Sequence, residues 1–171
     1  VAAGPMYNCA LRTEGTVACW GHNGSGQSTP PGGTFTQVAA GDSHCCGLAT
    51  NGTAICWGWD TYGESTPPAG TFTQIAAGNT HSCGLKTDGT IICWGANGYG
   101  MATPPGGTFT SVTLGTDHSC GLKTDGTLAC WGSDYYGQAT PPTGTFSRRL
   151  VGAGTLHTCE LKRNGRVACW G

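Results

Sequence analysis

Residues 81–95 read HSCGLKTDGTIICWG, and variants of this stretch occur five times along the chain. Each copy joins a Gly-x-x-His-x-Cys-x-Leu segment to a Gly-x-x-x-Cys-Trp-Gly segment. The copies end at Gly21, Gly58, Gly95, Gly132 and Gly171, so the period is 37, 37, 37 and then 39 residues. A fixed period of this length indicates an array of similar supersecondary units, each built from the recurring residues.

Within one copy the residue pattern predicts three β-strands. Residues 75–77 form a short apolar run, residues 81–86 alternate in character, and residues 90–94 are rich in β-branched and apolar side chains. The tripeptide Thr-Asp-Gly at 87–89 fits a three-residue hairpin loop that ends in a left-handed glycine. Each copy is therefore expected to form a small antiparallel sheet.

The two cysteines of each copy fix the register of this hairpin. A three-residue loop places Cys83 directly opposite Cys93, with about 4.5 Å between their Cα atoms, near the short end of disulfide geometry. A two-residue loop would instead place Cys83 opposite Trp94. We therefore expect one disulfide in each copy, contributing at most about 3 kcal/mol. The expected pairs are Cys9 with Cys19, Cys46 with Cys56, Cys83 with Cys93, Cys120 with Cys130, and Cys159 with Cys169.

The last strand of each copy is apolar on both faces. In the third copy Ile91 and Cys93 point one way, while Ile92 and Trp94 point the other. A sheet with two apolar faces must lie between neighbours. Small three-stranded sheets that stack in sequence form a propeller or a solenoid.

The repeat defines a single domain, 1–171, of unit cores joined by Pro- and Gly-rich connectors. Pro-Pro pairs favour extended connector geometry, and a recurring phenylalanine is expected to seat each connector against the core. These phenylalanines are Phe35, Phe72, Phe109 and Phe146. The expected cores are 1–21, 38–58, 75–95, 112–132 and 151–171, and the expected connectors are 22–37, 59–74, 96–111 and 133–150.

The motif Cys-Gly-Leu-Lys-Thr-Asp-Gly-Thr, followed by Cys-Trp-Gly-x-Asn/Asp-x-x-Gly-Gln, resembles the regulator-of-chromosome-condensation repeat. It is most similar to the short bacterial, secreted variety, and the resemblance covers essentially the whole chain. The resemblance implies a β-propeller, typically seven-bladed, with three-stranded blades that serve as a binding scaffold. Members include a chromatin-bound nucleotide-exchange factor, propellers that inhibit β-lactamases, and bacterial surface proteins.

The expected fold is therefore all-β: a β-propeller of five short three-stranded antiparallel blades with one intra-blade disulfide per repeat. Five copies leave two arrangements open, a closed five-blade ring and an open arc of a larger propeller. An arc would expose two apolar blade faces. We therefore consider self-assembly into oligomers or filaments.

Composition narrows the classes of partner and compartment. Only 10% of residues are charged and the formal net charge is −1, so nucleic acid is not an expected partner. No apolar run reaches the roughly 18 to 20 residues of a membrane span. Eleven cysteines favour an oxidising compartment and hence a secreted or cell-surface protein. The chain begins at Val1 without an initiator methionine, from which we expect a mature or trimmed chain.

The sequence offers no pattern that indicates catalysis, and we expect neither a cofactor nor a metal. Carboxylates are scattered, serines lack a nucleophile elbow, and no glycine-rich phosphate loop joins a strand to a helix. One repeat position holds His44, His81, His118 and His157, with Tyr7 in the first copy. A metal on the axis is conceivable, but a hydrogen bond between blades to the backbone is the preferred interpretation.

Residues outside the strict repeat are the better candidates for binding. The candidate contact surface consists of Trp59, Tyr62, Tyr99, Tyr135 and Tyr136. Aromatic side chains of this kind suit protein contacts or stacking on sugars. The alternative is that the recurring tyrosines only cover the connectors. Arg148 and Arg149 lie in the insertion before the fifth copy and mark either a contact or a looser joint, the second being preferred.

Three further residues are candidates for a specific chemical role. Cys45 has no partner in the pairing scheme, so it is either a free buried thiol or an intermolecular crosslink. Asn23 and Asn51 each open a glycosylation sequon, which matters in a source that glycosylates secreted proteins.

Taken together, the sequence predicts a non-enzymatic extracellular module that contacts proteins, including further copies of itself. A lectin-like module that binds glycans is the first alternative, and a protein inhibitor of an enzyme is the second.

Overall fold

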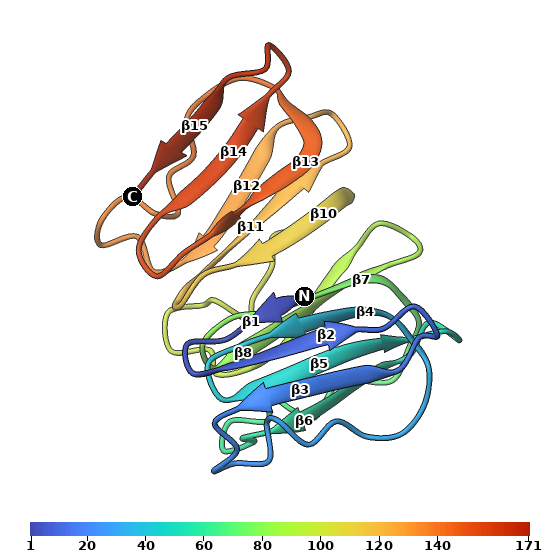
Figure 1. Cartoon of the computed structure of the whole chain (residues 1–171). Helices are drawn as coiled ribbons and strands as arrows, with labels where there is room; N and C mark the ends of the chain where they lie inside the picture. The colour runs from blue at the N-terminus through green and yellow to red at the C-terminus, as the bar shows by residue number, and fades with distance from the viewer.

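The computed structural model describes residues 1–147 and 152–171 of the chain. Five three-stranded antiparallel sheets follow one another in chain order, and each pairs only consecutive strands (Figure 1). Their strands are β1 Ala2–Ala3, β2 Tyr7–Leu11, β3 Val17–Gly21, β4 Phe35–Ala40, β5 His44–Ala49, β6 Ala54–Gly58, β7 Phe72–Ala77, β8 His81–Lys86, β9 Ile91–Gly95, β10 Phe109–Leu114, β11 His118–Lys123, β12 Leu128–Gly132, β13 Phe146–Ala153, β14 Thr158–Lys162 and β15 Val167–Trp170. The all-β prediction of five three-stranded blades is confirmed. The described residues contain no helix able to cross a bilayer.

The hairpin between the second and third strands of each blade has the expected register. In the third blade Cys83 pairs with Cys93, and the amide of Lys86 donates to the carbonyl of Thr90 at 2.8 Å across the loop. Gly89 has a φ of 83°, a left-handed conformation that disfavours other residues. Each of the five blades holds one disulfide, as predicted, with Cα atoms 4.0 to 4.1 Å apart, slightly closer than expected.

The first strand of each of the last four blades begins earlier than the sequence indicated. It starts at the recurring phenylalanine, three to five residues before the expected start of the core. In the third blade the register shifts between Phe72 and Gln74, and this bulge keeps Phe72 paired with Lys86. The Phe72 ring covers Gly84, where an added Cβ would lie 2.3 Å from the ring. The phenylalanine is thus part of the sheet, and it packs on Trp94 with ring centroids 6.1 Å apart.

The blades follow an open arc, with the first and fifth blades at its two ends (Figure 1). The first strand of each later blade contacts both the first and the second strand of the blade before it, as when β7 contacts β4 and β5, and β10 contacts β7 and β8. The core lies between blades. Cys46 and Leu48 of the second blade pack with Phe72, Ile75 and Trp94 of the third. Burial of each blade therefore depends on its neighbours.

The inner ends of the blades approach so closely that the backbone leaves no room for a side chain. A Cβ on Gly41 would lie 2.4 Å from the carbonyl oxygen of Gly78, and a Cβ on Gly78 would lie 2.6 Å from that of Gly115. The glycine of each Gly-x-x-His turn therefore sets the spacing between successive blades near the axis of the arc.

Candidate functional site

The two ends of the blades form two different faces. Each connector starts beside a Gly-x-x-His turn, as when the Trp59 amide donates to the Ser43 carbonyl at 2.9 Å. We call the end formed by these turns and by segments 22–29, 59–66, 96–103 and 133–140 the connector face. The opposite end carries the Thr-Asp-Gly-type loops, and we call it the hairpin face.

The five predicted contact residues all lie on the connector face. Their side chains are 48% to 86% exposed. Trp59 and Tyr62 share one connector, Tyr99 lies in the next, and Tyr135 and Tyr136 lie in the fourth, where their rings meet edge to face with centroids 4.9 Å apart. The structure therefore spreads them along the arc instead of gathering them into one pocket.

Side-chain hydrogen bonds fix the loops that present these aromatics. In the second connector both oxygens of Asp60 accept hydrogen bonds, from the Ser65 amide and the Thr66 hydroxyl, each at 2.7 Å. Glu64 accepts from the Tyr62 amide at 2.7 Å. Such closed loops present side chains with little loss of conformational entropy on binding.

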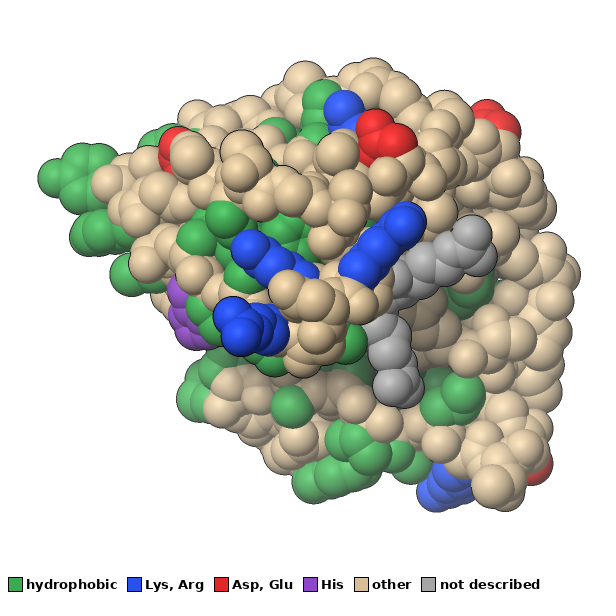
Figure 2. Space-filling view, turned by 90° about the horizontal axis from the view of Figure 1, so that it is seen from above, with side chains coloured by type: hydrophobic (Ala, Val, Ile, Leu, Met, Phe, Trp, Pro, Cys, Tyr) green, Lys and Arg blue, Asp and Glu red, His purple; other side chains and the backbone are tan. Residues whose placement is uncertain are grey.

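The described basic residues gather at one of the two faces, whereas carboxylates occur at both. The connector face carries the carboxylates Asp42, Asp60, Glu64, Asp117 and Asp134. The described basic residues belong instead to the hairpin face, at Arg12, Lys86, Lys123, Lys162, Arg163 and Arg166. That face also carries the carboxylates Glu14, Asp88 and Asp125 in its loops. Figure 2 shows several Lys and Arg side chains close together on the surface seen from above. The connector face is thus acidic and aromatic, although the chain as a whole is nearly neutral. Arg148 and Arg149 lie outside the described residues.

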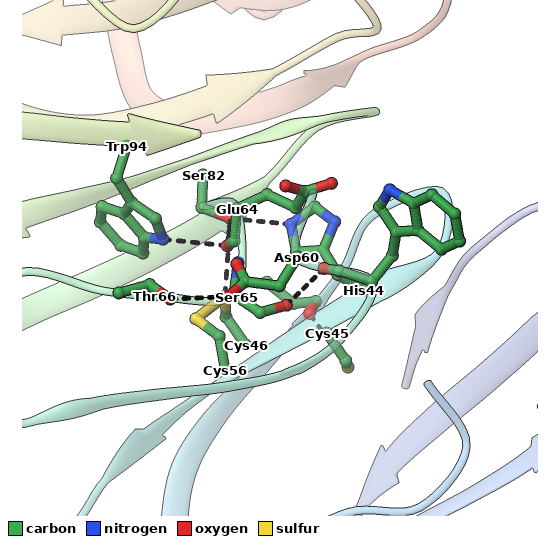
Figure 3. The surroundings of a disulfide bond; sticks show 12 residues. His44, Cys45, Cys46, Cys56, Asp60, Glu64, Ser65, Thr66, Ser82 and Trp94 are labelled. Carbon is green, nitrogen blue, oxygen red and sulfur yellow. Dashed lines mark hydrogen bonds between the residues drawn. A yellow bond between two sulfur atoms is a disulfide. The ribbon is translucent and has the colours of Figure 1, made fainter. Parts of the chain in front are cut away.

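The recurring histidines join neighbouring blades. His44 Nε2 lies 2.8 Å from the hydroxyl of Ser82 (Figure 3), and His81 Nε2 lies 2.9 Å from that of Ser119. The partner is a side-chain hydroxyl of the next blade, whereas the expected partner was the backbone. The Ser82 hydroxyl oxygen can accept a hydrogen bond from His44 because its own proton is donated to the Glu64 carbonyl at 3.3 Å.

This bonding pattern determines the protonation of the histidines. Because each serine donates to a carbonyl, the imidazole donates from Nε2–H, which leaves Nδ1 as the acceptor. Nδ1 of His44, His81 and His118 is buried and has no hydrogen-bond partner among the described residues. Burial lowers the pKa of His44 to about 4 and that of His81 to about 3. No group of three or more potential metal ligands occurs in the described part of the chain.

The first interface replaces the histidine and serine with Tyr7 and Cys45. The Tyr7 hydroxyl donates to the carbonyl oxygens of His44 and Gly41. Cys45 is a free, buried cysteine that takes the place of Ser82, and its thiol lies 3.1 Å from the Ala39 carbonyl. Burial raises the pKa of the Cys45 thiol to about 12, so the thiol remains protonated at neutral pH. Its position explains the odd cysteine as part of an interface between blades.

A second recurring contact was not predicted. The indole N–H of Trp57 donates to the Gln27 carbonyl at 2.9 Å, and that of Trp94 donates to the Glu64 carbonyl at 3.0 Å. The same bonds join Trp131 to Met101 at 2.8 Å and Trp170 to Gln138 at 3.1 Å. The connector residues recur every 37 positions, which is the signal that could have identified them.

The two sequon asparagines lie in different settings. Asn23 is held inside its connector, where its Nδ2 donates to the Thr29 hydroxyl at 2.9 Å. Asn51 lies exposed in a hairpin loop, and its Oδ1 accepts from the Thr53 hydroxyl at 2.7 Å. Both asparagines are exposed, and glycosylation at either one stays a prediction.

A hollow lies where the Gly-x-x-His turns of the last four blades meet the equivalent turn of the first blade, which begins at Gly4. It has a volume of about 570 Å³ and is lined by residues such as Gly41, Gly78 and Gly115. Its wall is mostly glycine, alanine and backbone, so it offers few side chains that could select a ligand.

Consecutive three-stranded blades around a common axis define a β-propeller architecture. The family model of the regulator of chromosome condensation (RCC1) repeat matches residues 1–27, 35–64, 72–100 and 109–138. The chain therefore belongs to this repeat family. No curated protein matches the sequence.

Solved structures agree with this assignment. The ectodomain of the Physcomitrella patens receptor kinase CR4 is 31% identical, with a TM-score of 0.84 over 98% of this chain and 50% of its own. The CRINKLY WD40 ectodomain of the Arabidopsis thaliana receptor kinase ACR4 is 28% identical, with a TM-score of 0.80 over 99% of this chain and 61% of its own. Yeast RCC1 (Prp20), solved bound to Kap60, is 19% identical, with a TM-score of 0.81 over 97% of this chain and 54% of its own. The chain thus spans about half to three fifths of the length of these structures.

Proposed function

We propose that this chain is an extracellular, non-enzymatic module that binds protein partners through its connector face. The observation that carries the proposal is the row of exposed aromatic residues on that face, held by hydrogen-bonded loops. Exposed aromatics on a rigid scaffold are typical of protein interfaces.

Two observations support the extracellular setting. The chain holds one disulfide in every blade, and disulfides of this density persist in oxidising compartments. Two of the similar solved structures are ectodomains of receptor kinases. Yeast RCC1, whose structure was solved with Kap60, is a propeller of this repeat type in a complex with a protein.

Selection from a displayed library of random peptides, run beside a glycan array, tests the proposal. We expect peptides to be enriched and glycans to remain unbound. A variant with alanine at Trp59, Tyr62, Tyr99, Tyr135 and Tyr136 should lose the selected peptides. A control variant with alanine at Arg12, Lys86 and Lys123 on the hairpin face should retain them. Glycan binding that depends on the aromatics, without peptide binding, would replace the proposal with the lectin-like alternative.

Self-association is a second candidate function, supported by the two ends of the arc. Trp20 of the first blade is 51% exposed, whereas the equivalent Trp94 is 8% exposed. His157 of the fifth blade is exposed, whereas the equivalent His81 is buried against the next blade. The two ends thus present opposite halves of the contact between blades, which suits head-to-tail association of copies.

Sedimentation velocity over a hundred-fold range of concentration tests self-association. We expect the sedimentation coefficient to rise with concentration, and Trp20→Ser to weaken this rise. A sedimentation coefficient that stays at the monomer value throughout would exclude head-to-tail association.

A further inference from the structure

A groove on the connector face combines an exposed aromatic side chain with carboxylates. It has a volume of about 220 Å³ and lies where the first two connectors meet the Gly-x-x-His turns of the second and third blades. Trp59, Glu64, Asp42 and Asn79 are among the residues that line it. No Lys or Arg contributes to this lining.

Glu64 departs from the repeat in a way that leaves a charge in the wall of the groove. The equivalent residues Gln27 and Gln138 use their Nε2 to bond the side chain five residues earlier, His22 at 2.8 Å and Ser133 at 3.2 Å. Glu64 has no N–H to donate, and the residue five positions earlier is Trp59. The bond seen in the first and fourth connectors is therefore replaced here by a carboxylate beside an indole.

The Glu64 side chain is only 1% exposed. One carboxylate oxygen, Oε2, accepts from the Tyr62 amide at 2.7 Å, and the residue lies in the wall of the groove. A carboxylate in the wall of a groove attracts a positive charge, and its oxygens can accept hydrogen bonds from a cationic donor. Neighbouring His44 is kept neutral at physiological pH by its burial between the blades, which lowers its pKa, and it does not supply that charge.

We propose that this groove receives a basic side chain, lysine or arginine, from a protein partner. The cation lies against the face of Trp59 and donates to Glu64 and Asp42. An aromatic face attracts a cation electrostatically, and a guanidinium group matches carboxylate geometry with two parallel hydrogen bonds. The inference deepens the proposed function, on which it rests, by naming the chemistry of the partner.

A neutral sugar fits the groove less well than a cation. A sugar could stack on Trp59, but it would not neutralise the charge of the buried Glu64 carboxylate. The distribution of basic residues supports the same choice, because those of the described part of the chain lie at the other face. The connector face as a whole therefore attracts a basic partner over the range set by ionic strength.

The test uses N-acetyl-L-arginine amide as the probe and follows the indole N–H signal of Trp59 by NMR, assigned from its loss in Trp59→Phe. N-acetyl-L-citrulline amide is the matched neutral control, and methyl glycosides test for sugar binding. We expect the arginine amide to bind at least about five-fold more tightly than the citrulline amide. The preference should shrink as salt is added.

Two variants test the roles of Glu64 and Trp59. Each introduces a side chain that another copy of the repeat carries at the same position. Glu64→Gln introduces the residue present at Gln27 and Gln138, and Trp59→Ala introduces the residue present at Ala96. We expect each to weaken binding of the arginine amide at least about five-fold, while Asp117→Asn, at another turn of the same face, leaves it unchanged. An unchanged disulfide map and circular dichroism spectrum establish that the variants are folded.

The proposal is overturned by equal binding of the two amides, by no shift of the Trp59 signal up to about 100 mM of either, or by a shift with methyl glycosides alone. It is also overturned if Glu64→Gln binds the arginine amide as tightly as the native chain. If library peptides are still selected by the connector face while the arginine amide fails, the inference falls and the proposed function stands. If peptides are not selected while the arginine amide binds, the proposed function fails and a cation site remains.

Discussion

The third blade and the two terminal blades share one sequence pattern but differ in their surroundings. Trp94 and Ile91 of the third blade are buried between neighbouring blades. The residue equivalent to Trp94 in the first blade, Trp20, is exposed, and so is the residue equivalent to Ile91 in the fifth blade, Val167. The disulfide and hairpin are the same in all three. The disulfide therefore fixes the hairpin within a blade, while burial and much of the hydrophobic stabilisation come from the neighbouring blades on both sides.

The largest effect should come from removing a core indole. Trp94→Ala deletes a buried ring that packs on Phe72 and donates to the Glu64 carbonyl, and we expect a loss of about 4 kcal/mol in the free energy of unfolding. Trp20→Ala in the first blade should cost about 1 kcal/mol, because its ring is half exposed. Denaturant unfolding at neutral pH measures both. Equal losses would mean that the terminal blade is packed as tightly as the interior one.

A smaller difference in stability between interior and terminal blades is expected when glycines near the axis are replaced by alanine. In Gly78→Ala the new methyl group meets the Gly115 carbonyl of the next blade at 2.6 Å, and we expect a cost of about 3 kcal/mol. In Gly154→Ala the nearest atoms belong to the exposed imidazole of His157, which can move aside, so the cost should stay below about 1 kcal/mol. Thermal unfolding of the two variants gives the comparison. A destabilised Gly154→Ala would show that another surface covers the fifth blade.

Mild acid should lower the free energy of unfolding through the buried histidines of the interior blades, at a pH above that at which carboxylates become protonated. Burial lowers the folded-state pKa of His44 to about 4 and that of His81 to about 3, below the ordinary value of 6.5. As the pH falls, the unfolded chain binds protons at these histidines before the folded chain does. The free energy of unfolding is therefore highest above pH 6.5 and decreases as the pH drops towards 4. The loss is on the order of 3 kcal/mol for each group. Urea unfolding between pH 7 and 4.5 measures the slope.

Matched variants identify the source of this slope. His81→Gln should flatten it, because a titrating group is removed from an interface between blades. His157→Gln, at an exposed position in the terminal blade, is the matched control variant. A slope that is the same in His81→Gln and the native chain would assign acid sensitivity to other groups.

The smallest effect is expected at Cys45. Cys45→Ser introduces the residue that the third and fourth blades carry at Ser82 and Ser119, so stability should change by less than about 1 kcal/mol. Because the thiol is buried, non-reducing gels should show the same bands for the variant and the native chain. Loss of a dimer band in the variant would instead identify Cys45 as an intermolecular crosslink.

Local chemistry made much of the blade predictable from sequence. The spacing between Cys83 and Cys93 and the glycine of the Thr-Asp-Gly loop are compatible with one hairpin register, and the structure has it. The strand start at Phe72 was missed because it depends on a bulge, which leaves no signal in hydropathy. The bulge became visible only through the pairing of Phe72 with Lys86.

Contacts between blades were harder to predict because both partners must be known together. The histidine position was expected to bond across an interface, but the hydroxyl of Ser82 could not be chosen over the backbone without the packing of the third blade on the second. Glu64 was overlooked for a similar reason. Its position recurs as Gln, Glu and Met, so its side-chain chemistry gave no common role, while its backbone carbonyl carried the shared contact.

Hydrogen exchange of the monomer, followed by mass spectrometry, tests most directly whether the ends of the arc are open. We expect amides of β9 in the third blade to exchange at least about ten-fold more slowly than those of β15 in the fifth. The reason is that the third blade is covered on both faces, whereas the fifth is covered on one. Equal protection of β9 and β15 would contradict the account, since it would mean that the terminal blade is as fully enclosed as the interior one.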